Sequence, residues 1–166
     1  FDPLFPFGYG LSYTTFKYSN VKLSSASLKK DDVLTVTFDL ENTGKYKGTE
    51  VAQLYIQDKV GSVTRPVKEL KGFEKVQLAP GETKTVTMEL DKRSFAWYNT
   101  ELHDWYAASG KYEILIGASS RDIRLSETIE LSSSQVIPMH IHMNTTLGEL
   151  FNNPDTKEAA KELTSR

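Results

Sequence analysis

The sequence predicts an all-β sandwich over residues 14–132, preceded by an interdomain linker over residues 1–13 and followed by a tail with short helices over residues 133–166. Through most of the central region apolar side chains alternate with polar ones, as in strands that bury one face. Turn-forming residues interrupt this alternation at intervals of about 8–12 residues, with no helical spacing between them. These features indicate about seven short strands arranged in two stacked sheets.

The strands follow from the alternation in chain order. The first is expected around Phe16 and Tyr18, and the run 34–40 then places four apolar side chains on one face and polar ones on the other. The run Val51–Ile56 is apolar on both faces, which is typical of a central strand covered on both sides. Further alternating runs are at residues 86–90, 112–116 and 123–131.

The two ends of the chain differ from this pattern. The linker is rich in aromatic residues, glycine and proline, which exclude a helix and leave Phe5, Phe7 and Tyr9 in need of a neighbouring surface. We therefore expect these three side chains to dock on another domain, and the start at Phe1 to mark a piece of a longer protein. In the tail, Thr146 and Glu149 form a capping box, and Asn153 before Pro154 opens a second short helix.

Composition excludes several classes of function. The 166 residues include 22 acidic and 20 basic side chains in no long run of one sign, so nucleic acid is not an expected partner. No run reaches the about 18 apolar residues of a membrane-spanning helix, so no membrane partner is expected. The absence of cysteine excludes cysteine nucleophiles and thiolate metal sites, and leaves open a cytoplasmic or a secreted location. No cofactor is expected.

Several segments resemble one family when they are read in order. They are FPFGYGLSYTTF at 5–16, GTEVAQLYIQD at 48–58, RPVKELKGFEKV at 65–76, APGETKTVTMEL at 79–90 and GKYEILIGASSRDIRL at 110–125. This set resembles the C-terminal fibronectin type III-like domain of glycoside hydrolase family 3 enzymes, typically β-glucosidases and β-xylosidases. The resemblance implies an immunoglobulin-like sandwich that is ancillary to a catalytic barrel and α/β domain in the same polypeptide.

Catalytic and metal sites are not expected in this chain. The family's nucleophile is an aspartate followed by tryptophan, but its barrel domain is absent here, so Asp104 before Trp105 is interpreted as a surface carboxylate. His140 and His142 point to one side of an extended segment and would need a third ligand, for which Glu127, His103 and Asp104 are the candidates. Two histidines alone are a weak signal, and the prediction is that no metal binds.

The aromatic cluster before Gly110 leaves two interpretations open. Trp97, Tyr98, Trp105 and Tyr106 could stack on sugars if they are exposed and coplanar, or they could pack in the core or against another domain. Arg65, held extended by the proline that follows it, is a candidate contact to a carboxylate of a neighbouring domain or a residue of a solvated loop.

Three functions are compatible with these residues. The favoured hypothesis is a non-catalytic accessory domain that packs on and stabilises the catalytic domains of a β-glycosidase. The alternatives are a carbohydrate-binding module that grips polysaccharide through Trp97 and Trp105, and a protein-interaction domain of a cell surface, which the fold alone would permit.

Overall fold

The computed structural model describes residues 3–29, 32–61, 64–135, 137, 141–153 and 156–164. The chain forms two compact units, Phe1–Gln135 and Val136–Arg166. The first contains strands β1 to β10 and a short helix, and the second contains two helices.

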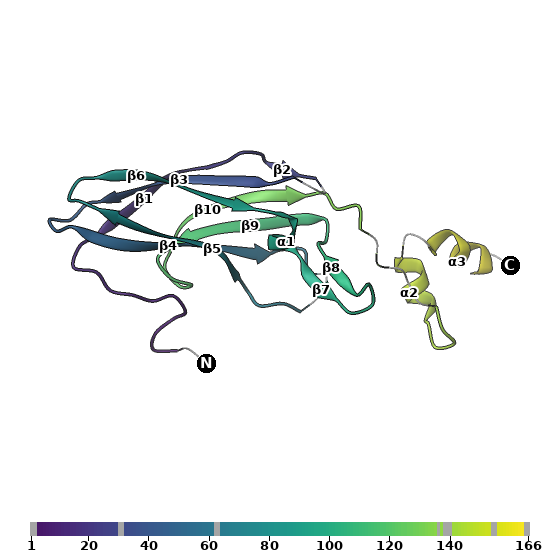
Figure 1. Cartoon of the computed structure of the whole chain (residues 1–166). Coiled ribbons are helices and arrows are strands. Elements are labelled where there is room, and N and C mark those ends of the chain that lie inside the picture. The colour runs from purple at the N-terminus through teal and green to yellow at the C-terminus, as the bar shows by residue number, and fades with distance from the viewer. Residues whose placement is uncertain are drawn as a thin grey trace. The chain divides into compact units, whose positions relative to one another are not determined.

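Two sheets stack face to face in the first unit (Figure 1). The smaller sheet has the order β1 (Phe16–Leu23), β3 (Leu34–Asn42), β6 (Thr83–Leu90). The larger sheet has the order β2 (Ser27–Leu28), β10 (Ile123–Leu131), β9 (Gly110–Gly117), β4 (Gly48–Asp58), β5 (Glu69–Leu78). Neighbours are antiparallel except for the short pairing of β2 with β10. The predicted all-β, immunoglobulin-like sandwich is confirmed.

A third, two-stranded sheet projects at one end of the sandwich. Helix α1 (Lys92–Phe95) leads into β7 (Trp97–Asn99), which pairs with β8 (Asp104–Tyr106) as an antiparallel hairpin. The Asp91 side chain accepts a hydrogen bond from the Ser94 backbone and caps the helix. Phe95 then inserts into the core with no exposed surface, so the hairpin is attached to the sandwich through a buried ring.

The core lies between the inner faces of the two sheets, as the alternation predicted. Strand β3 alternates strictly between buried and half-buried side chains along its length. The side chains that share this core come from β6 of the same sheet and from β4 and β9 of the opposite sheet. They include Ala52, Leu54, Ile56, Val86, Met88, Leu90, Tyr112, Ile114 and Ile116. The predicted double-sided burial of β4 is also confirmed, because its residues 52–56 are all buried.

One buried polar side chain fixes the point where the N-terminal segment enters the sandwich. Asn42 is fully buried, and its Nδ2 donates to the backbone oxygens of Tyr46 and Leu78 at 2.8 and 3.1 Å. Its Oδ1 accepts from Thr14 Oγ1 at 2.7 Å and from the Gly44 backbone at 3.0 Å. A buried amide with all of these groups paired costs the fold little and specifies one loop geometry.

The second unit consists of helices α2 (Leu147–Asn152) and α3 (Lys157–Thr164). The predicted capping box is confirmed, since Thr146 and Glu149 exchange side-chain to backbone hydrogen bonds. No helix among the described residues is long and apolar enough to cross a membrane.

Candidate functional site

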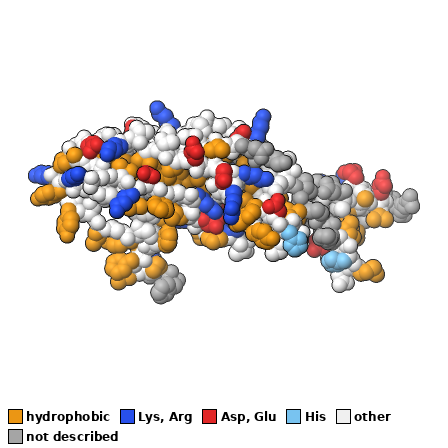
Figure 2. Space-filling view, in the orientation of Figure 1, with side chains coloured by type: hydrophobic (Ala, Val, Ile, Leu, Met, Phe, Trp, Pro, Cys, Tyr) orange, Lys and Arg blue, Asp and Glu red, His pale blue; other side chains and the backbone are white. Residues whose placement is uncertain are grey.

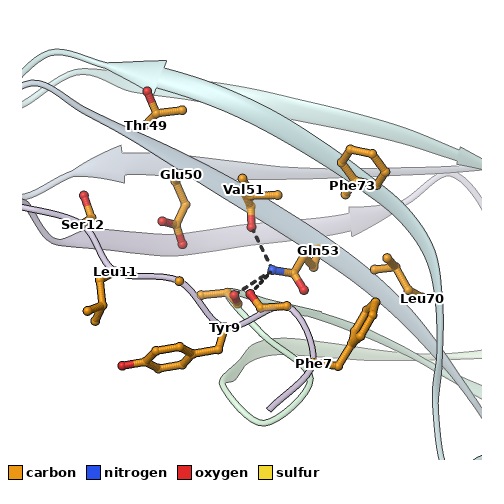
Figure 3. A pocket seen from close by; sticks show the side chains of 13 residues that line it. Phe7, Tyr9, Leu11, Ser12, Thr49, Glu50, Val51, Gln53, Leu70 and Phe73 are labelled. Atoms are coloured by element: carbon orange, nitrogen blue, oxygen red, sulfur yellow. Dashed lines mark hydrogen bonds between the residues drawn. The ribbon is translucent and has the colours of Figure 1, made fainter. Parts of the chain in front are cut away.

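The N-terminal segment, residues 3–15, lies against the outer face of the larger sheet, opposite the core. Gln53 of β4 holds it there (Figure 3). Gln53 is 4% exposed; its Nε2 donates to the backbone oxygens of Gly8 at 2.9 Å and Ala118 at 2.8 Å. Its Oε1 accepts from the Tyr55 hydroxyl at 2.5 Å. One amide therefore joins the segment, the strand and the β9–β10 loop.

Glycine at position 8 is required by this contact. Gly8 has a φ of +77°, a conformation that side chains with a Cβ rarely adopt. A Cβ there would lie 1.9 Å from Gln53 Oε1. The neighbouring backbone is also fastened, because Ser120 N donates to the Phe7 oxygen at 2.9 Å and Arg121 Nη2 donates to the Pro3 oxygen at 3.1 Å.

Large apolar side chains surround this anchored segment and stay open to solvent. Phe7 and Phe73 are 67% and 65% exposed, and Tyr9, whose ring lies 5.3 Å from that of Phe5, is 48% exposed. Between the segment and strands β4 and β5 they leave a concavity of about 370 Å³ (Figure 3). Apolar side chains also gather over this part of the surface in the space-filling view (Figure 2). We call Phe5, Phe7, Tyr9, Val51 and Phe73 the outer-face patch. A contiguous apolar patch of this kind is typical of an interaction surface.

A half-buried carboxylate lies beside the concavity. Glu50 accepts a hydrogen bond from the Tyr18 hydroxyl at 2.8 Å, and burial raises the pKa of both groups. Arg124, whose guanidinium is 6.0 Å from the Tyr18 ring, bonds both oxygens of Asp122 and holds the pKa of that carboxyl below its usual range. Both carboxyl groups therefore already have partners within this domain, Glu50 a hydroxyl and Asp122 a guanidinium.

The aromatic cluster forms two separate pairs on the hairpin. Trp97 meets Tyr106 at 4.8 Å between ring centroids, and Tyr98 meets Trp105 at 6.0 Å, both edge to face. The register pairs Trp97 with Tyr106 and Tyr98 with Trp105, so the two pairs occupy opposite faces of the hairpin. Trp97 and Trp105 therefore lie on opposite faces of the hairpin and do not form one coplanar platform, which was one of the two interpretations that the sequence left open.

Arg65 is engaged within its own domain. Its side chain is 9% exposed, and its guanidinium bonds Asp58 at 3.1 Å and Glu69 at 2.5 Å. It also donates to the Phe95 backbone oxygen at 3.2 Å and lies 5.4 Å from the centre of the Trp97 ring. Arg65 therefore joins the hairpin to the sandwich, and we call this set of contacts the Arg65 clasp. The role differs from both interpretations that the sequence left open, a residue of a solvated loop and a contact to a neighbouring domain.

The remaining candidates show no reactive arrangement. Asp104 is exposed, and its Oδ1 accepts from the backbone N–H of Trp105. No group of three metal-binding side chains occurs among the described residues, and His140 lies outside them.

Gln53 and Gly8 are the two site residues that sequence reasoning missed. The available signal was a glutamine inside the otherwise apolar run Val51–Ile56, since a buried amide must find partners. Nothing in the sequence pointed from that glutamine to a glycine 45 positions earlier.

Comparison with known proteins agrees with this fold. Residues 50–120 match the family described as "Fibronectin type III-like domain". Thermostable β-glucosidase B of Acetivibrio thermocellus is 47% identical over 152 residues, which are 92% of this chain and 20% of that protein. The chain carries a fibronectin type III-like domain of glycoside hydrolase family 3.

Solved structures of β-glucosidases contain a region with the same fold. β-Glucosidase 3B of Thermotoga neapolitana in complex with glucose superposes with a TM-score of 0.71 at 42% identity, covering 78% of this chain and 17% of that one. The family 3 β-glucosidase of Bifidobacterium adolescentis gives a TM-score of 0.76 at 32% identity, covering 96% and 22%. The chain thus spans about a fifth of the length of these relatives.

Proposed function

We propose that this chain is a non-catalytic accessory domain that packs on and stabilises the catalytic domains of a β-glycosidase of the β-glucosidase type. The observation that carries the proposal is the outer-face patch, a set of exposed rings gathered around a backbone segment that is itself rigidly held. The family 3 relatives support the parent activity, because they are named as β-glucosidases.

Docking of the patch is favourable on physical grounds. Full burial of one large apolar side chain stabilises a structure by about 1.5–3 kcal/mol. Phe7, Tyr9 and Phe73 are each about half exposed or more, so covering them would contribute several such increments. Because Gln53 and Gly8 already order the segment, little additional conformational entropy is lost when a partner covers it.

The proposed occupant is the remainder of the same polypeptide. The relatives are about five times as long as this chain, and the segment fixed on the outer face runs from residue 3 into β1. Whatever precedes that segment in a longer protein is therefore tethered beside the patch. A covalent tether raises the effective concentration of the docking partner and makes an interface of modest size sufficient.

The buried and half-buried carboxylates of the sandwich support a non-catalytic role. Retaining glycosidases need two carboxyl groups about 5–5.5 Å apart, one as nucleophile and one as acid/base. Here Glu50 is bonded to a tyrosine, and Asp58 is neutralised by Arg65. We expect no hydrolysis of aryl β-glucosides by this chain alone. Hydrolysis above that of a denatured control, if the substitution Asp104→Asn abolished it, would overturn the proposal.

The docking claim is tested in the full-length enzyme by thermal unfolding. Phe73→Ala should lower its Tm and its resistance to protease while leaving the unfolding of the isolated chain nearly unchanged. Tyr46→Ala is the matched control, because Tyr46 is 67% exposed and lies outside the patch. Equal effects of the two substitutions in the full-length protein would contradict docking through the outer face.

A further inference from the structure

A second concavity lies at the hairpin, on surface that the outer-face patch does not include. It has a volume of about 390 Å³, and Trp105 of β8 and Arg93 of α1 line it together with the carboxylates of Asp32, Asp91 and Asp104. Small-molecule sites commonly combine an aromatic wall with a few convergent polar groups in a pocket of about 300–1,000 Å³. We name these five residues the hairpin pocket.

The polar groups of the hairpin pocket retain bonding capacity. The Arg93 guanidinium stacks over the Trp105 ring at 4.4 Å and makes no side-chain hydrogen bond or ion pair within the described part of the chain. Asp91 uses Oδ1 to cap the helix, and Asp104 uses Oδ1 for the adjacent backbone N–H. The second oxygen of Asp91 and that of Asp104 accept no hydrogen bond from the described residues, whereas Asp32 Oδ2 accepts from the Lys29 backbone N–H at 2.8 Å. A guanidinium supplies donors only and a carboxylate acceptors only, so the pocket suits a ligand that both donates and accepts.

The aromatic wall favours a ligand that also has an apolar face. Trp105 is 38% exposed, and its edge-to-face partner Tyr98 is 51% exposed, on the side of the hairpin away from the Arg65 clasp. A pyranose ring presents C–H groups on its faces and hydroxyl groups at its edge. Because Arg93 covers one face of the indole, the C–H groups would contact the part of Trp105 that remains exposed, and the hydroxyls would bond Arg93, Asp91 and Asp104.

The pocket is held in shape before any ligand arrives. The Gln135 side chain bridges two backbone groups, donating to the Trp105 oxygen at 3.0 Å and accepting from Ala107 N at 3.2 Å. Asn99 caps the hairpin turn by accepting from the backbone of Glu101 and Leu102 at 2.9 Å. A rigid wall reduces the entropy that binding must overcome.

We propose that the hairpin pocket is a carbohydrate-binding subsite that takes one unit of a β-linked glucan chain through Trp105, Arg93, Asp91 and Asp104. The choice of sugar rests on the proposed function, because the relatives are β-glucosidases. The presence of the pocket does not depend on the proposed function, because its lining residues alone define it.

The test is affinity electrophoresis of this chain in gels that contain laminarin or a soluble cellulose derivative, with titration of tryptophan fluorescence by laminari- and cello-oligosaccharides. Wild type should be retarded, and Trp105→Ala should bind at least about tenfold more weakly. In Asp104→Asn the side-chain oxygen can still accept the hydrogen bond from the Trp105 backbone N–H, so the variant should stay folded. It should bind about threefold or more weakly than wild type. Tyr46→Ala serves as the control and should bind as wild type does.

Two outcomes would overturn the inference. One is a wild-type chain that neither glucan retards and neither oligosaccharide series perturbs. The other is undiminished binding by a folded Trp105→Ala or Asp104→Asn variant. Neither result bears on the accessory role, which is judged by Phe73→Ala in the full-length enzyme, so the two proposals can fail separately.

Discussion

The two faces of strand β4 differ in what covers them. The inner face packs against the opposite sheet, whereas the outer face adjoins large apolar side chains that remain exposed to solvent. Toward the core, Ala52, Leu54 and Ile56 meet the opposite sheet and are at most 4% exposed. On the outer face Gln53 and Tyr55 are just as buried, and Gln53 is bonded to a segment whose own rings remain largely in solvent.

This difference separates stability from interaction. The core cluster lies within residues 16–131, and its apolar side chains pack against one another. The outer face is held by a few directional hydrogen bonds to Gln53, which fix geometry while burying little apolar area. Substitutions that act on the two faces should therefore differ in size and in the measurement that detects them.

The largest effect is expected from a core substitution. Phe38 has no exposed surface and stacks on Tyr18 at 6.0 Å, so Phe38→Ala should lower the free energy of unfolding by about 3–5 kcal/mol. Phe73→Ala on the outer face should change it by less than about 0.5 kcal/mol in the isolated chain. Urea denaturation measures both, and similar losses for the two variants would remove the distinction between the faces.

The Arg65 clasp should behave like the interior. Arg65→Ala leaves the 9% exposed Asp58 carboxylate unpaired, for an expected loss of about 3 kcal/mol. The control is Lys59→Ala, which breaks a pair of the same 3.1 Å length with Glu113 in which the side chains are 42% and 33% exposed. That loss should be at most about 1 kcal/mol. Near-equal losses would show that burial does not govern these ion pairs.

A smaller and more local effect is expected at the anchor of the N-terminal segment. Gly8→Ala places a Cβ against Gln53 and should release the segment, with a loss of about 1–3 kcal/mol and faster chymotryptic cleavage after Phe7 or Tyr9. Gly10→Ala is the control, because a Cβ at that position would meet no atom within 4 Å. Equal cleavage of the two variants would mean that the segment is not held by Gly8 and Gln53.

The smallest effect is a pH dependence at the edge of the concavity. Burial raises the pKa of Glu50, so the folded chain keeps this proton to higher pH than the unfolded chain does, and stability falls as pH rises above about 4.5. Glu50→Gln stays neutral and can still accept the Tyr18 hydrogen bond. Its stability relative to wild type should therefore increase between pH 4 and pH 7 in denaturation experiments. Parallel profiles for the two proteins would contradict the assigned role of burial.

Prediction from the sequence succeeded where one local pattern determines the outcome. Alternation identified β3 and the two-sided burial of β4, and the Thr146–Glu149 spacing identified the start of α2. It failed where partners are distant along the chain. The pairing of Gln53 with Gly8, and of Arg65 with the hairpin, depends on which strands become neighbours.

By itself, the sequence determined the sandwich, because periodic burial is a property of each strand taken separately. Only the tertiary structure decided which aromatic rings are exposed and available for binding. The hairpin register sends Trp97 under Arg65 and Trp105 into the hairpin pocket, and the approach of Gly8 to Gln53 lays the N-terminal rings on the outer sheet. Both results come from contacts between elements, which no local spacing encodes.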